Sequence, residues 1–190
     1  MSEAFWQQKY EAGQTGWERG DANPAFLAWR AGGTLTQGRV LLPCAGRSPE
    51  PALLAADGFD VTVLDIAPSA IAAQRARLGD RAAVIEADLF TWTAPAPFDA
   101  IYDQTALCAL PPPRHAEYEA LLHPWLRPGG RLLILFAQTG RPGGPPFDCP
   151  IDRMRGLFAA PRWRWPERLE PPLRHPTGMV EQPAVLGRLA

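Results

Sequence analysis

A glycine turn and a later carboxylate are the residues of this chain whose types and spacing best suit chemistry. The apolar run 39–43 leads into Cys44, Ala45 and Gly46, and the next apolar run ends at Asp65. In a strand–turn–helix–strand unit, such a glycine lets the backbone approach a ligand, and the carboxylate binds a ribose diol. The turn lacks the three glycines that a pyrophosphate requires. The pattern therefore predicts a nucleoside ligand without phosphates, and S-adenosylmethionine fits that description.

Apolar periodicity and proline or glycine signals place these residues in alternating strands and helices. We expect strands at 39–43, 60–65, 82–86, 98–103, 131–137, 162–169 and 181–189. We expect helices at 2–12, 24–30, 49–57, 68–78, 113–126 and 151–158, with a turn at 127–130 and a loop at 140–146. This alternation is typical of an α/β fold with a doubly wound, mostly parallel, seven-stranded Rossmann-like sheet. We expect one domain, 1–190, with an N-terminal helical lid at 1–36 and a core at 37–190.

Four polar or small residues are expected at one edge of this sheet. In doubly wound sheets, ligands bind at the carboxyl ends of the strands, near the switch point of the strand order. Gly46, Asp65, Asp88 and Asp103 each follow or end such a strand. The sequence therefore predicts that they line one crevice. The carboxylates can also act as helix caps, loop caps or structural groups.

The composition argues against several classes of function. A formal net charge of −1 gives no general electrostatic attraction to nucleic acid. No apolar run is long enough to span a bilayer, and residues 1–6 do not resemble a secretion signal. Three scattered cysteines suit neither a disulfide framework nor a metal site. We expect a cytoplasmic monomer or weak homodimer without a metal, a nucleic-acid partner or a membrane association.

Several segments together resemble the thiopurine S-methyltransferase superfamily, including its thiol and halide methyltransferase branch. The most specific segments are 107–112, with sequence LCALPP, and 144–147, with sequence GPPF. The remaining ones are 5–24, 43–48, 63–71, 87–90 and 98–103. The resemblance implies a class I methyltransferase that uses S-adenosylmethionine, releases S-adenosylhomocysteine and methylates a small-molecule acceptor, typically a thiol.

The resemblance also implies roles for individual residues. Cofactor contacts would come from the lid, the first turn and the strand ends, through Trp6, Trp17, Pro43, Cys44, Ala45, Gly46, Asp65, Ile66, Asp88, Leu89, Phe90, Asp103 and Thr105. Acceptor contacts would come from Gln104, Cys108, Pro145 and Phe147. Candidates for a catalytic role are Gln104, Tyr10 and Arg19. Among these, Gly46 would lie under the methionine part, Asp65 would hold the ribose hydroxyls and Asp88 would meet the adenine.

Two departures from the family pattern concern the acceptor and the first turn. The thiopurine branch usually has arginine directly after the aspartate of the fourth strand, where this chain has Gln104. The usual Cys-Gly of the first turn is replaced by Cys44 and Ala45, with Gly46 following. The strand-four pattern favours the thiol and halide branch. A halide or thiopurine methyltransferase, or a nonenzymatic protein of the same fold that binds S-adenosylmethionine, remains an alternative.

Several candidate residues also have an ordinary structural interpretation. Trp6 and Trp17 can be core residues of the N-terminal segment, and Cys44 and Cys108 can be small core residues rather than nucleophiles. Arg19 can be a solvated charge. A thiol acceptor with a pKa near 8.5 is partly ionised at neutral pH, so the reaction requires no strong general base. A nicotinamide-dependent reductase is disfavoured because the glycines of its fingerprint are missing.

Overall fold

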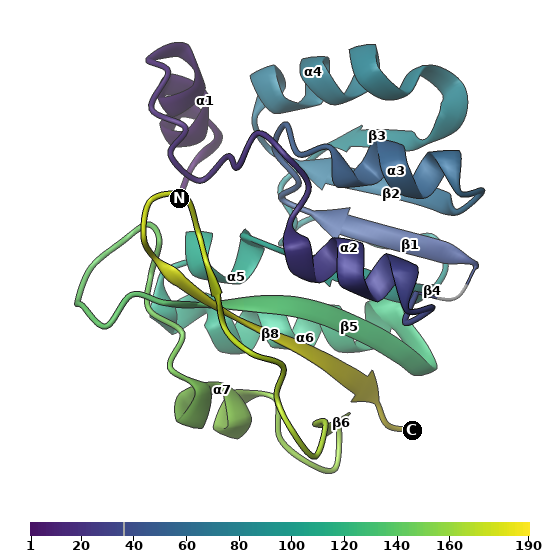
Figure 1. The fold of residues 1–190 in the computed structure, drawn as a ribbon. Coiled ribbons are helices and arrows are strands. Elements are labelled where there is room, and N and C mark those ends of the chain that lie inside the picture. Colours follow the sequence, from purple (N-terminus) through teal and green to yellow (C-terminus); the bar gives the residue numbers. More distant parts are fainter. Residues whose placement is uncertain (36) are drawn as a thin grey trace. The chain divides into compact units, whose positions relative to one another are not determined.

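The computed structural model describes residues 1–35 and 37–190, and the chain separates into two units, an N-terminal unit (1–93) and a C-terminal unit (94–190) (Figure 1). The predicted lid boundary at residue 36 lies outside the described residues. The prediction of one domain with a lid at its N-terminus stays a prediction. From residue 39 to residue 86 of the N-terminal unit, strands and helices alternate as the sequence predicts, whereas the C-terminal unit ends in three successive strands.

The N-terminal unit contains a parallel sheet in the order β3–β2–β1. Its strands are β1 (Arg39–Pro43), β2 (Asp60–Asp65) and β3 (Ala83–Glu86). Leu42 of β1 lies opposite Val63 of β2, which in turn lies opposite Val84. Because the strands run in parallel, the turn after β1 and the carboxylate that ends β2 emerge at the same edge of this sheet.

The helices of the N-terminal unit begin and end at the predicted signals. They are α1 (Glu3–Glu11), α2 (Pro24–Ala31), α3 (Glu50–Ala56) and α4 (Pro68–Leu78). Asn23 caps α2 by accepting a hydrogen bond from the backbone N–H of Ala25, and Pro24 follows at the first helical position. Helices α3 and α4 both pack on β2, α4 also packs on β3, and α1 contacts α4 (Figure 1). Helix α4 therefore contacts both the sheet and the N-terminal helix.

The C-terminal unit contains a mixed sheet in the order β4–β5–β8–β6, with β7 also pairing with β8. Its strands are β4 (Phe98–Asp103), β5 (Leu126–Gln138), β6 (Trp163–Arg164), β7 (Leu173–Arg174) and β8 (Val180–Arg188). Strands β4 and β5 are parallel, whereas β8 runs antiparallel to β5, β6 and β7. Its helices are α5 (Ala106–Ala109), α6 (His115–Trp125) and α7 (Ile151–Leu157). Both α5 and α6 pack on β5.

Three segments of the C-terminal unit differ from the prediction. Residues 127–130, predicted as a turn, lie within β5. The pairing of β5 with β4 is irregular at this point, between the partners of Phe98 and Ala100. The strand predicted at 162–169 is reduced to β6, because Pro161 and Pro166 flank it and cannot donate to a ladder. The described residues contain eight strands rather than seven because of the short β7. The α/β class with mostly parallel strands is confirmed.

Candidate functional site

The turn after β1 has an unusual backbone. Cys44 has φ 48° and Gly46 has φ 56°, so both adopt left-handed conformations. A non-glycine residue such as Cys44 pays about 1–2 kcal/mol in this region. A side chain at Gly46 would place its Cβ 2.7 Å from the hydroxyl oxygen of Tyr10. Glycine is therefore required at position 46 both by the backbone and by the close approach of a neighbour.

Asp65 ties this turn to the end of β2. Its Oδ2 accepts a hydrogen bond from the N–H of Gly46 at 2.8 Å, and its Oδ1 accepts one from the N–H of Ala67 at 2.9 Å. The residue is only 7% exposed, and burial raises the pKa of its carboxyl while the backbone donors oppose that rise. A carboxylate has about four acceptor positions, and the backbone donors of Gly46, Ile66 and Ala67 use about three of them, which leaves about one for a ligand hydroxyl. The predicted neighbourhood of Gly46 and Asp65 is confirmed as geometry.

An aromatic cluster from the N-terminal segment covers the turn. The rings of Tyr10 and Trp17 meet edge to face with centroids 5.5 Å apart, and those of Trp6 and Trp17 do so at 5.4 Å. Tyr10 forms a core with Ala67, the N-cap residue of α4, and with Ala70 in the first turn of that helix. Burial raises the pKa of Tyr10 and the Asp65 carboxylate adds to that rise, so the phenol stays neutral. A neutral phenol can donate a hydrogen bond but cannot act as a general base.

An ion pair connects the turn to the polar loop between α1 and α2. Arg47 donates through Nε and Nη2 to the two carboxylate oxygens of Glu18, at 2.7 and 2.6 Å. The same guanidinium lies 5.0 Å from the centre of the Tyr10 ring. Burial raises the pKa of Glu50, and the positive charge of Arg19 is among the influences that oppose this rise. The loop that carries Arg19 is thus anchored through its neighbour Glu18.

Residues 88–90, which follow β3, form a local turn. Asp88 Oδ1 accepts a hydrogen bond from the N–H of Phe90 at 2.9 Å. Leu89 is buried, whereas Phe90 and, after β2, Ile66 are partly exposed. The predicted contact of these apolar side chains with adenine stays a prediction.

Asp103, at the end of β4, is engaged within its own unit. Its Oδ1 accepts hydrogen bonds from the N–H groups of Ala106 and Leu107, and its Oδ2 accepts one from the Tyr118 hydroxyl at 3.0 Å. It is 1% exposed, and burial raises its pKa to about 6. This arrangement supports the structural interpretation of Asp103 as the cap of α5, and its predicted contact with the cofactor remains a prediction.

Gln104 follows Asp103 and is oriented by a tyrosine. Its Oε1 accepts a hydrogen bond from the Tyr102 hydroxyl at 2.8 Å, which directs the acceptor end of the amide toward that ring. Thr105 is the N-cap residue of α5, and its carbonyl oxygen accepts a hydrogen bond from the Cys108 thiol. Burial raises the pKa of Cys108, so the thiol is a neutral core group.

The two most specific segments of the resemblance meet in the C-terminal unit. The N–H of Phe147 donates to the carbonyl oxygen of Cys108 at 2.7 Å. Gly144 is packed against the Phe147 ring, because a Cβ there would lie 2.6 Å from Cγ of that ring. Pro145 and Phe147 are partly exposed. The segment 144–147 therefore presents apolar side chains beside α5.

Two residues that hold the turn after β1 were not among the sequence candidates. Gln74 and Arg77 of α4 donate hydrogen bonds to backbone carbonyls of that turn. The signal for Gln74 was its place on the buried face of α4, where Ala70, Ile71 and Leu78 are apolar. A polar residue in such a stripe needs a hydrogen-bond partner. Spacing along the chain could not identify which partner it has.

Comparisons with known proteins agree with this geometry. The profile of the thiopurine S-methyltransferase (TPMT) family matches residues 1–170. The chain is 31% identical over 178 residues to a thiopurine S-methyltransferase of Aliivibrio salmonicida (strain LFI1238), covering 84% of each chain. It is 29% identical over 156 residues to a probable thiol methyltransferase 2 of Arabidopsis thaliana, covering 79% of this chain and 69% of that protein.

Solved structures share the fold. A 1,6-didemethyltoxoflavin-N1-methyltransferase of Burkholderia thailandensis, in complex with S-adenosylhomocysteine, matches with a TM-score of 0.79 and 21% identity. The match covers 99% of this chain and 87% of that protein. Among the described residues, no helix has both the length and the apolar character that a membrane span requires.

The family profile and the thiopurine S-methyltransferase relative show that the chain belongs to the thiopurine S-methyltransferase family. It is an S-adenosylmethionine-dependent methyltransferase of a small-molecule nucleophile, as the sequence predicts.

Proposed function

We propose that this enzyme methylates the sulfur of a small thiol, with residues 43–46 and Asp65 on the cofactor and Gln104 on the acceptor. The observation that carries the choice of acceptor is the neutral amide of Gln104, held by Tyr102 at the end of β4. The curated relatives named above, a thiopurine and a probable thiol methyltransferase, support sulfur as the methylated atom. An amide donates hydrogen bonds to a soft thiolate, but it does not provide the charge that holds a carboxylate.

The residues of the N-terminal unit fit a bound S-adenosylmethionine. Gly46 carries no side chain where the backbone must approach a ligand, and Asp65, which already accepts backbone hydrogen bonds from Gly46, Ile66 and Ala67, lies beside it as the proposed acceptor for a ribose hydroxyl. Trp6 and Trp17 are only partly buried, so their rings have surface left to contact a ligand. When bound, S-adenosylmethionine supplies a methyl group on a positively charged sulfur. The protein's own task is to fix the ends of that molecule and to hold the acceptor in line.

Direct transfer without a protein nucleophile agrees with the state of the buried thiols. Burial raises the pKa of Cys108, and it raises the pKa of Cys149 to about 12. Neither side chain is therefore a thiolate at neutral pH. A thiol acceptor ionises more readily than these residues do, because its ordinary pKa is near 8.5. The acceptor itself is the nucleophile in this proposal, and Gln104 orients it.

The finer assignments of partner and location are also proposals. Among the described residues, none of the three cysteines forms a disulfide, and the net charge is −1. These features support a cytoplasmic enzyme that acts without nucleic acid, as a monomer or weak homodimer. Light scattering coupled to size-exclusion chromatography measures the mass of the particle, and a stable tetramer would contradict this assignment.

Turnover with labelled S-adenosylmethionine tests the proposed reaction. The acceptor panel contains alkyl thiols, an aromatic thiol with a carboxylate, hydrogen sulfide and iodide. We expect label transfer to the uncharged thiols first, with kcat/KM above that for the carboxylate-bearing thiol. Transfer to iodide alone would favour the halide alternative. Binding of S-adenosylhomocysteine without any turnover across the panel would favour a nonenzymatic role.

A further inference from the structure

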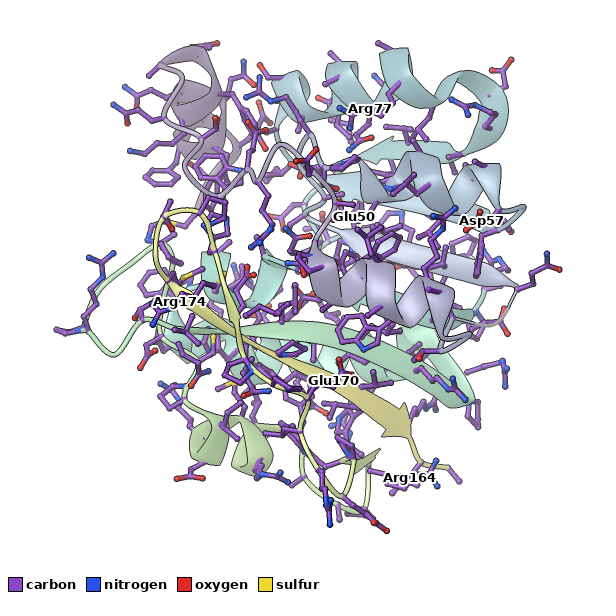
Figure 2. The ribbon with its side chains drawn as sticks, viewed as in Figure 1. Glu50, Asp57, Arg77, Arg164, Glu170 and Arg174 are labelled. Carbon is purple, nitrogen blue, oxygen red and sulfur yellow. The ribbon has the colours of Figure 1, made fainter. Side chains whose placement is uncertain are left out.

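Three successive carbonyl groups of the turn after β1 accept hydrogen bonds from side chains of α4. Gln74 Nε2 donates to the carbonyls of Gly46 and Ser48, each at 2.9 Å. Arg77 Nη1 donates to the carbonyls of Arg47, at 2.7 Å, and Ser48, at 2.5 Å; Figure 2 labels Arg77 on this helix. These bonds join residues 26 to 30 positions apart in the sequence. Side chains of α4 thus hold the backbone of the turn, and this does not depend on which side chains the turn carries.

Gln74 is placed as a donor rather than as a packing residue. Its side chain is fully buried on the apolar face of α4. Its Nε2 serves two carbonyls, while its Oε1 has no hydrogen-bond partner among the described residues. A buried acceptor without a partner destabilises the fold. An apolar residue of the same size would avoid that cost, so the useful part of Gln74 is the pair of N–H groups.

The two peptide groups that flank the Cα of Gly46 are held from different elements. The N–H of Gly46 donates to Asp65 at 2.8 Å, and the carbonyl of Gly46 accepts from Gln74. The same turn contains two left-handed residues, Cys44 and Gly46. Backbone in sparsely populated regions persists only where the surrounding structure fixes it. Asp65 and Gln74 together provide that fixation at the residue where the backbone must approach the ligand.

We infer that Gln74 is a positioning residue for the cofactor, which with Arg77 keeps the Gly46 turn in the shape that receives the amino-acid part of S-adenosylmethionine. The inference rests on the proposed function. In this inference Gln74 does not contact the cofactor, because its amide N–H groups donate hydrogen bonds to the carbonyls of the turn. Its effect therefore falls on the part of the ligand that lies over the turn. The ribose is assigned to Asp65, which is bonded to Gly46 but keeps its bond to Ala67 outside the turn when Gln74 is replaced.

The test compares two ligands that differ only in this part. S-Adenosylhomocysteine contains the amino-acid group, and 5′-methylthioadenosine lacks it. Calorimetry measures both dissociation constants for the wild-type protein and for Gln74→Met, which keeps the length of the side chain and removes its N–H groups. We expect the dissociation constant of S-adenosylhomocysteine to rise about tenfold, because the buried carbonyl of Gly46 loses its side-chain donor and the carbonyl of Ser48 keeps only that of Arg77. That of 5′-methylthioadenosine should change by less than about twofold.

A control on the same helix separates this effect from damage to α4. Arg75 is exposed, and its guanidinium lies 3.8 Å from Glu86 rather than at the turn. Arg75→Met should leave both dissociation constants unchanged. If Gln74→Met does not fold, Arg77→Met removes the outer pair of donors from an exposed side chain. Arg77→Met should also weaken the binding of S-adenosylhomocysteine more than that of 5′-methylthioadenosine, by a smaller factor than Gln74→Met.

Two results would overturn the inference. Equal losses for both ligands would show that Gln74 supports the fold in general, and no loss for either would show that it only fills space. A wild-type protein that binds S-adenosylhomocysteine but methylates no acceptor would overturn the proposed function alone. The ratio of the two dissociation constants would still test the role of Gln74. A wild-type protein that binds neither ligand would overturn both.

Discussion

The turn after β1 and the residues after β4 are built in different ways. Around Gly46, the backbone is bonded by side chains from distant elements, Asp65 and Gln74. After β4, Asp103 bonds mainly the helix that follows it, and Gln104 accepts a hydrogen bond from Tyr102 two positions earlier. The bonds around Gly46 fix the shape of the backbone, whereas the bonds after β4 allow a different residue type at position 104. A scaffold of this kind can keep one methyl donor while the acceptor changes.

Among the variants that contrast these two regions, the largest effect is expected from filling the fixed turn. In Gly46→Ala, the added Cβ meets the Tyr10 hydroxyl at 2.7 Å and the backbone is strained at φ 56°. We expect calorimetry to show a loss of S-adenosylhomocysteine affinity of about 100-fold. Gly79→Ala is the matched control, because its φ is 53° but nothing lies within 4 Å of its Cβ. Equal losses in both variants would mean that strain alone, and not the close approach, explains glycine at position 46.

The buried carboxyl at the end of β4, Asp103, should affect the stability of the fold rather than cofactor binding. Burial raises the pKa of Asp103 from 3.8 to about 6, so between these values the folded state binds more protons than the unfolded state. The contribution of this group to stability therefore falls as pH rises from about 4 to 6, by about 1–3 kcal/mol. Asp103→Asn should lack this fall.

Urea unfolding at pH 4.5 and pH 6.5 measures the difference between Asp103→Asn and the wild-type protein. Burial also raises the pKa of Glu50 and Asp65, and these groups contribute equally to both proteins. The comparison therefore isolates Asp103. An identical pH dependence in the two proteins would mean that Asp103 is ionised throughout this range.

A smaller effect is expected at the variable side chain. Gln104→Arg introduces a charge that forms charge-assisted hydrogen bonds with a carboxylate. We expect kcat/KM for the carboxylate-bearing aromatic thiol to rise about tenfold relative to an uncharged thiol. Affinity for S-adenosylhomocysteine should stay within about twofold of the wild type. If both acceptors respond alike, Gln104 does not contact the acceptor.

The smallest effect is expected from the tyrosine that orients this amide. Tyr102→Phe removes the donor to Gln104 and keeps the ring. We expect KM for the thiol to rise about threefold while kcat and cofactor affinity hold, because the amide gains rotational freedom without leaving its place. Steady-state kinetics at saturating S-adenosylmethionine measures this. A fall in cofactor affinity would show that Tyr102 acts through the rest of the site.

The sequence predicted the elements whose signals are local. Strands at 39–43, 60–65 and 98–103 have the predicted bounds, since each is an apolar run ended by proline or aspartate. The α4 helix also has its predicted bounds, from Pro68 to Leu78. The neighbourhood of Gly46 and Asp65 followed from the parallel order of the strands. These features depend on periodicity and on residues that begin or end elements.

Other features could not be predicted because they depend on distant partners. Helix α5 has four residues, too few for a periodic pattern, and the cap from Asp103 organises it. Strand β7 has two residues and is defined only by its pairing with β8. The bonds from Gln74 to the turn join residues 26 and 28 positions apart, and nothing in the local sequence names those carbonyls. Tertiary contacts decided each of these features.

The central claim is that Asp65 holds the ribose of the methyl donor. Titration of S-adenosylhomocysteine into the wild-type protein, Asp65→Ala and Asp60→Ala tests it most directly. Asp60 begins the same strand, is exposed and pairs with Arg39, so its removal is the control. We predict micromolar or tighter binding to the wild type and to Asp60→Ala, and no detectable binding to a folded Asp65→Ala. Wild-type affinity in Asp65→Ala would contradict the account.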